Sequence, residues 1–187
     1  MATTHTLDAI VLKTHDIGEA DRFCILFTRE RGRLAARAQG VRRPTSRMGS
    51  CLLPFRHITV ELVEGRSSYT ITAARSVDQN NRDPTEVLPR FLAGSQIVEL
   101  LLLLLQDGEP LPEIFDCTAA LLRRPSGDTD LHAFTVRILR LLGLLPYTGH
   151  TSFRHFTLLE QQLIEQWTNG EDMQSALPGT ARARMRD

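Results

Sequence analysis

The spacing of apolar residues changes once along this chain, near residue 80, and this change constrains the fold most. Over residues 7–77 the dominant spacing is two, in a stretch rich in Val, Ile, Thr, Phe and Tyr. Beyond residues 78–84 the apolar residues recur at intervals of three and four. Strands followed by helices, rather than alternating with them, predict an α+β protein in which a β module precedes an all-α module.

The first half predicts five strands, at residues 7–15, 22–30, 33–41, 55–64 and 68–77. Short turns join them, except after the third strand, where Pro44 and Gly49 interrupt the pattern for longer. Five short strands connected in this way favour a small closed sheet, and the five-stranded barrel of the OB-fold is the obvious candidate. We therefore expect an OB-fold domain at residues 1–80.

The second half predicts four helices, at residues 85–108, 111–124, 130–143 and 157–170. Gly143 and Gly170 stand where a helix C-cap is expected. The most apolar run, residues 97–106, is about half the length needed to span a bilayer and contains Glu99, so we interpret it as a buried helix. These patterns predict a helical domain at residues 81–176 and a flexible tail at residues 177–187.

Charge is distributed unevenly although the whole chain is formally neutral. Residues 1–80 carry twelve basic and eight acidic groups, and the remainder carries ten and fourteen. Residues 31–50 hold six arginines, no lysine and no carboxylate. Because an ordinary solvated surface mixes both signs, this asymmetry suggests a polyanion partner for the first half. A purely solvated surface is the alternative.

The arginine stretch divides into a strand part and a loop part. Arg33 and Arg37 lie four apart on the third strand, so they project from the face opposite Leu34, Ala36 and Ala38. Planar guanidinium groups suit phosphate oxygens, and such a surface binds DNA or RNA with little sequence preference. Phe23, Phe27, Phe55 and Tyr69 could stack on bases, but we expect most of them in the core. The candidate contacts, which continue into a loop, are Arg31, Arg33, Arg37, Arg42, Arg43 and Arg47.

Enzyme motifs are missing from the sequence, and no catalytic residue is predicted. The only lysine, Lys13, falls in a predicted strand, and no P-loop, nucleophile elbow, HExxH helix or Rossmann glycine pattern occurs. Asp16, Glu19 and Asp21 could hold Mg²⁺, but the composition of a turn explains them more simply. A metal-dependent nuclease that uses this turn is kept as a minor alternative.

Cysteine usage and the N-terminus point to a reducing compartment. Cys24, Cys51 and Cys117 lie far apart with no CxxC pair, so neither a disulfide framework nor a thiolate zinc site is predicted. The first ten residues do not read as a signal peptide. We expect a cytoplasmic protein, associated with the nucleoid, without a membrane partner, cofactor or metal.

Residues 11–55 resemble the N-terminal domain of the bacterial RecO family of recombination mediators. The similarity lies in GEAD in the first turn, LFTRERGRL, GVRRPTSRMG and LLPF, and RLLGLLP at residues 140–146 resembles the helical part. The resemblance implies a mediator of DNA repair that binds single- and double-stranded DNA and anneals complementary strands. It further implies that RecR and the acidic, hydrophobic tail of single-strand-binding protein are partners, and that RecA is loaded with RecR.

For the tail, the resemblance suggests only a groove in the helical half with Arg137 or Arg140 meeting the terminal carboxylate. Many members place a four-cysteine zinc module after the LLGLLP region, where this chain has residues 147–156 with His150 and His155. We interpret these two histidines as loop residues, and the chain as a short, metal-free form. A protein-interaction scaffold that docks acidic tails, with DNA binding secondary, is the alternative function.

Overall fold

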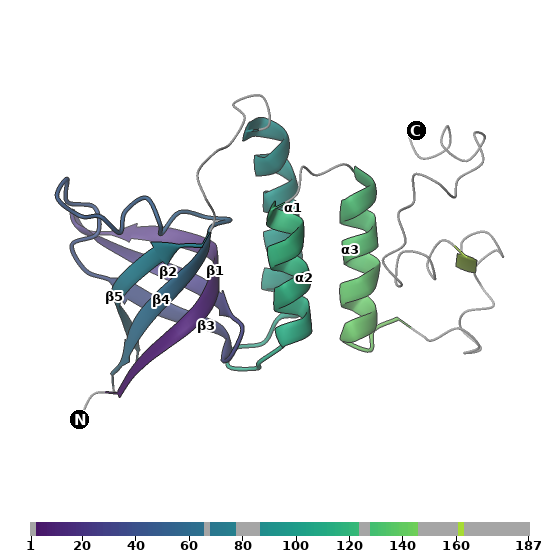
Figure 1. The fold of residues 1–187 in the computed structure, drawn as a ribbon, viewed down its shortest axis with the longest axis horizontal. Helices are drawn as coiled ribbons and strands as arrows, with labels where there is room; N and C mark the ends of the chain where they lie inside the picture. Colours follow the sequence, from purple (N-terminus) through teal and green to yellow (C-terminus); the bar gives the residue numbers. More distant parts are fainter. Residues whose placement is uncertain (1–2, 66–67, 78–86, 124–127, 146–160, 163–187) are drawn as a thin grey trace. The chain divides into compact units, whose positions relative to one another are not determined.

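The computed structural model describes residues 3–65, 68–77, 87–123, 128–145 and 161–162. Five strands come first: β1 (Thr3–Ile17), β2 (Asp21–Thr28), β3 (Gly32–Ala38), β4 (His57–Glu64) and β5 (Tyr69–Ser76). Three helices follow: α1 (Val87–Leu104), α2 (Pro112–Arg123) and α3 (Asp128–Leu141). Figure 1 shows this order along the chain, which confirms the α+β class.

The strands close into a barrel in the order β1-β2-β3-β5-β4. Closure depends on β1, which is longer than predicted and pairs with both of its neighbours. Its first part runs antiparallel to β4 from Thr3 opposite Glu64, and its second part pairs with β2 as far as Ile17 opposite Asp21. All neighbouring pairs are antiparallel except β3 and β5, which run parallel over a short register.

Apolar side chains at every second position of the strands fill the interior of the barrel. In β3 the residues from Gly32 to Ala38 are buried at every second position, as the sequence predicts. The third strand was expected to reach residue 41, but it ends at Ala38 because Gly40 turns the chain with a φ of 63°. The loop that follows is part of the fold, since its Val41 and Leu52 are buried in the barrel core.

Helices α1 and α2 pack with the barrel, and the chain divides into two compact units, residues 1–125 and 126–187. Phe115 of α2 meets Phe27 of β2 edge to face with ring centroids 5.5 Å apart. Gly94 of α1 lies directly beneath the ring of Phe55, which itself contacts Phe91 at 5.6 Å. The domain boundary predicted at residue 80 and the predicted tail remain predictions.

The leucine-rich run forms the end of α1, but it is not buried all round. Ile97, Val98 and Leu101 are buried, whereas Leu103 is 83% exposed. The prediction of a buried helix is therefore wrong for one side of α1. None of the helices among the described residues is long and apolar enough to cross a membrane.

Helix ends were partly foreseen. Gly143 adopts a φ of 69° just after α3, which confirms the predicted cap. The fourth predicted helix and Gly170 lie outside the described residues, apart from residues 161–162, which are helical.

Candidate nucleic-acid interface

Arg33 projects outward from β3 as predicted, but it binds the segment that follows α1. Its Nε lies 2.6 Å from Oδ1 of Asp107, and its Nη1 donates a hydrogen bond of 2.8 Å to the carbonyl of Leu102. The backbone joins this contact, because the N–H of Gly108 donates to the carbonyl of Arg33. Only 21% of the Arg33 side chain is exposed. The expected absence of a balancing acid is wrong here, since the acid comes from another part of the sequence.

Arg37 projects from the same face of β3 and pairs with Asp21 at the start of β2. Its Nε and Nη2 both donate to Oδ2 of Asp21, at 3.0 and 2.5 Å. The other oxygen of Asp21 accepts a hydrogen bond of 2.8 Å from the N–H of Gly40. The bond from Gly40, followed by the bond from Arg37, lowers the pKa of Asp21. Half of the Arg37 side chain, 49%, is nevertheless exposed.

Arg42 opens the loop and pairs with the turn between β1 and β2. Its Nε lies 3.2 Å from Asp16, and its Nη1 donates to the carbonyl of Gly18. Asp16 also accepts a hydrogen bond of 2.9 Å from Arg22, which is the main reason that its pKa is lowered. Asp16 and Asp21, two of the three carboxylates that the sequence offers for Mg²⁺, are thus engaged by arginines, whereas Glu19 is not. The described part of the chain contains no group of three metal-ligating side chains.

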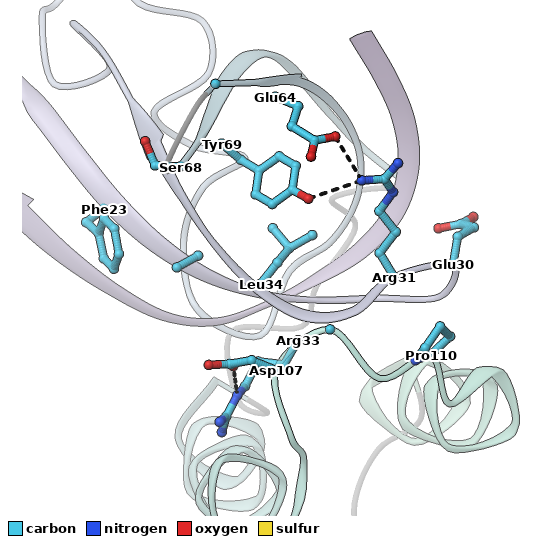
Figure 2. Close-up of a pocket in the computed structure, with 13 residues that line it drawn as sticks. Phe23, Glu30, Arg31, Arg33, Leu34, Glu64, Ser68, Tyr69, Asp107 and Pro110 are labelled. Atoms are coloured by element: carbon cyan, nitrogen blue, oxygen red, sulfur yellow. Dashed lines mark hydrogen bonds and ion pairs between the residues drawn. The ribbon is translucent and has the colours of Figure 1, made fainter. Parts of the chain in front are cut away.

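Arg31 borders a groove at the other end of β3 with a volume of about 810 Å³. Figure 2 shows its guanidinium group directed at Glu64 and the hydroxyl of Tyr69, with distances of 3.2 and 3.1 Å. His5 lies 3.1 Å from the same guanidinium group. Leu34 lines the middle of the groove. Both charged and aromatic groups therefore line this groove.

The aromatic residues are less buried than predicted. Phe27 is fully buried, but Phe23, Phe55 and Tyr69 are each only partly buried. Tyr69 nevertheless packs against the barrel core, so the prediction that most of them belong to the core holds for Phe27 and Tyr69 and not for the other two. Phe23 and Tyr69 line the groove beside Arg31. Their positions in strands were visible in the sequence, but their place in the lining of this groove was not.

Arg43 and Arg47 differ from the other four candidates because they are exposed and form no ion pair with any residue that the structure describes. Both belong to the loop anchored by Val41 and Leu52. Arg22, from β2, holds this loop by donating hydrogen bonds to the carbonyls of Gly49 and Leu52. An anchored loop whose exposed Arg43 and Arg47 form no ion pair among the described residues can meet an anionic surface through them without breaking a salt bridge of the fold.

Sequence reasoning missed the structural arginine just before this stretch. Arg29 forms a bidentate ion pair with Asp116 of α2, in which Nε lies 2.9 Å from Oδ1 and Nη2 lies 3.0 Å from Oδ2. These two residues are 87 positions apart. No local pattern pairs them, because their meeting depends on how α2 packs against β2.

The remaining candidates lie in the second compact unit or outside the described residues. Arg137 is exposed and Arg140 is partly buried, and they stand three apart on α3, hence on one face. Arg140 already has an interaction partner. His150 and His155 lie outside the described residues.

A closed barrel with an exposed basic loop, followed by helices, defines this chain as an α+β protein with a candidate nucleic-acid-binding module. Comparison with known proteins gives the family. The profile of the recombination protein O N-terminal domain matches residues 1–80, and that of the C-terminal domain matches residues 86–183. The chain therefore belongs to the recombination protein O (RecO) family, a family of DNA repair and recombination proteins.

One curated relative is the DNA repair protein RecO of a Nocardioides species. It is 48% identical over 92 residues, which cover 49% of this chain and 38% of the relative. The aligned part thus spans well under half of that relative.

Proposed function

We propose that this chain is a mediator of DNA repair and homologous recombination whose barrel is an OB-fold that binds single- and double-stranded DNA. Two observations together support the proposal. Arg43 and Arg47 are both exposed and form no ion pair among the described residues, and both halves of the chain match the RecO family. In this proposal the loop contacts phosphates and makes no sequence-specific contact with the bases.

The physical basis is the release of counterions from the phosphate backbone. A guanidinium group that neutralises a phosphate displaces a condensed cation, so affinity falls as salt rises. Arg43 and Arg47 make such contacts without breaking an existing ion pair among the described residues, whereas Arg31, Arg33, Arg37 and Arg42 must first leave a carboxylate. We therefore propose Arg43 and Arg47 as the primary phosphate contacts, with Arg37 and Arg42 beside them.

The wider role in the proposal follows the family. The chain anneals complementary strands, and with RecR it helps to load the RecA recombinase, without being an enzyme and within the cytoplasm. Single-strand-binding protein is a partner through its acidic, apolar tail. Arg137 supports this contact, because the exposed Leu141 follows it by one helical turn and offers an apolar neighbour to a cation.

The test is fluorescence anisotropy of a labelled 30-nucleotide single strand across a salt series, with the full chain. Arg43→Ala and Arg47→Ala are each expected to lower the affinity several-fold and to reduce the slope of log K against log salt by about 0.7. Arg123→Ala removes the same charge from the exposed end of α2 and is expected to leave the slope unchanged. Binding by the wild type that does not vary with salt would refute the proposal.

The scaffold alternative is separated by a second titration. A peptide that ends in apolar residues preceded by aspartates is expected to lose affinity with Arg137→Glu and to keep it with Arg47→Ala. If the chain binds this peptide but no DNA, the scaffold function replaces the mediator function.

A further inference from the structure

Asp16 and Asp21, which flank the turn between β1 and β2, each bind an arginine that is a candidate for phosphate contact. Asp21 receives two hydrogen bonds from Arg37, and Asp16 lies 3.2 Å from Arg42. A carboxylate and a phosphate offer a guanidinium group the same pair of oxygen acceptors. We infer that Asp16 and Asp21 compete with DNA phosphates for Arg42 and Arg37, and thereby weaken DNA binding by β3 and the loop that follows it.

The exposure of these groups makes the competition possible. Side-chain exposure is 49% for Arg37 and 36% for Arg42, so a phosphate can approach both from solvent. Ion pairs at this level of exposure are weak, because water and salt screen them. The arginines can therefore exchange partners without loss of the fold.

The same turn supplies a control for charge alone. Glu19 lies between Asp16 and Asp21 in the sequence, is exposed, and forms no ion pair with any residue in the described part of the chain. Replacing Glu19 with Gln removes one negative charge from the same place but releases no arginine. A difference between Glu19 and its two neighbours therefore reports the arginine contacts rather than the net charge.

This inference rests on the proposed function, and the anisotropy titration with the labelled single strand tests it. Asp16→Asn and Asp21→Asn are each expected to raise the affinity about fivefold. Each is also expected to steepen the salt slope by about 0.7, because one more arginine engages a phosphate. Glu19→Gln is expected to raise the affinity less than twofold and to leave the slope unchanged. The Asn side chain at position 21 keeps an oxygen for the N–H of Gly40.

A double-mutant cycle tests whether the gain in affinity comes from the released arginine rather than from a change in the fold. In an Arg37→Ala background, Asp21→Asn is expected to give no gain beyond that of Glu19→Gln, because the released arginine is absent. The same is expected for Asp16→Asn in an Arg42→Ala background, because Arg22, the other arginine bound to Asp16, is only 15% exposed and keeps its hydrogen bonds to the carbonyls of Gly49 and Leu52. Circular dichroism and the thermal midpoint of each variant verify that it is folded.

The outcomes separate this inference from the proposed function. Equal gains for the three acidic positions would overturn the inference and leave DNA binding intact. A loss of affinity in Asp16→Asn or Asp21→Asn would show that the carboxylates position the arginines instead of competing for them, which also overturns it. If the wild type does not bind DNA, it is the proposed function that fails.

Discussion

Arg33 and Arg47 are the same residue type, fourteen positions apart, in the most basic stretch of the chain, yet their surroundings differ in kind. Arg33 lies on a strand and holds the segment after α1 through Asp107 and the carbonyl of Leu102. Arg47 lies in a loop and forms no ion pair with the described residues. A cluster of like charges in the sequence can thus combine residues that stabilise the fold with residues that are available to bind a ligand.

The largest expected effect concerns the close approach beside Arg33. Gly32 has a φ of 65°, and a Cβ there would collide with the backbone carbonyl of Glu109. Gly32→Ala is expected to lower the free energy of unfolding by about 3 kcal/mol, from backbone strain and displacement of the segment. Urea titration followed by circular dichroism measures this loss.

Gly18 provides the matched control from the turn that receives Arg42. Its φ is 56°, but a Cβ there meets no atom within 4 Å. Gly18→Ala is therefore expected to cost only the backbone strain, about 1 kcal/mol. If both substitutions cost the same, the contact between β3 and the segment after α1 is not what distinguishes the two regions.

A medium effect should separate the two arginines directly. Arg33→Ala is expected to lower the free energy of unfolding by about 1 kcal/mol, because it removes an ion pair and a hydrogen bond to a backbone carbonyl. Arg47→Ala is expected to change it by less than about 0.5 kcal/mol. For DNA binding we expect the opposite order, with a larger loss of affinity in Arg47→Ala than in Arg33→Ala. A larger change of salt slope in Arg33→Ala would instead support Arg33 as a DNA contact.

The smallest effect is the pH dependence of the Arg29–Asp116 pair. Hydrogen bonds from Arg29 lower the pKa of Asp116 below its usual 3.8. A carboxyl group whose pKa is lowered by folding stabilises the fold above its unfolded pKa, and this contribution is lost as pH falls through the folded pKa. Asp116→Asn is therefore expected to lower the thermal midpoint by no more than about 3 °C at pH 7. The difference from the wild type should shrink below pH 4.

Glu99→Gln is the control for that measurement, because Glu99 is exposed on α1 and forms no ion pair with the described residues. Its thermal midpoint is expected to follow that of the wild type at every pH. A difference for Asp116→Asn that persists unchanged at pH 3 would contradict the assignment of its stabilising effect to the ion pair.

Local pattern predicted the elements of this fold but not their contacts. The alternation around Leu34 and Ala36 identified β3 and its buried face, and Gly143 identified the end of α3. The burial of Leu52 from an irregular loop was not predictable, because no period marks it. Likewise, the exposure of Leu103 within an apolar run depends on which side of α1 meets the barrel.

For the candidate site, the sequence nominated a stretch of arginines, which stays a prediction, but not the contacts that each arginine makes. It determined by itself the α+β class, the order of strands and helices, and the concentration of positive charge, since these follow from periodicity and composition within short windows. Only the tertiary structure decided that Arg33 forms an ion pair with Asp107, 74 positions away, while Arg43 and Arg47 form none with the described residues. Ion pairs depend on distances in space, and packing of the helices against the barrel sets those distances.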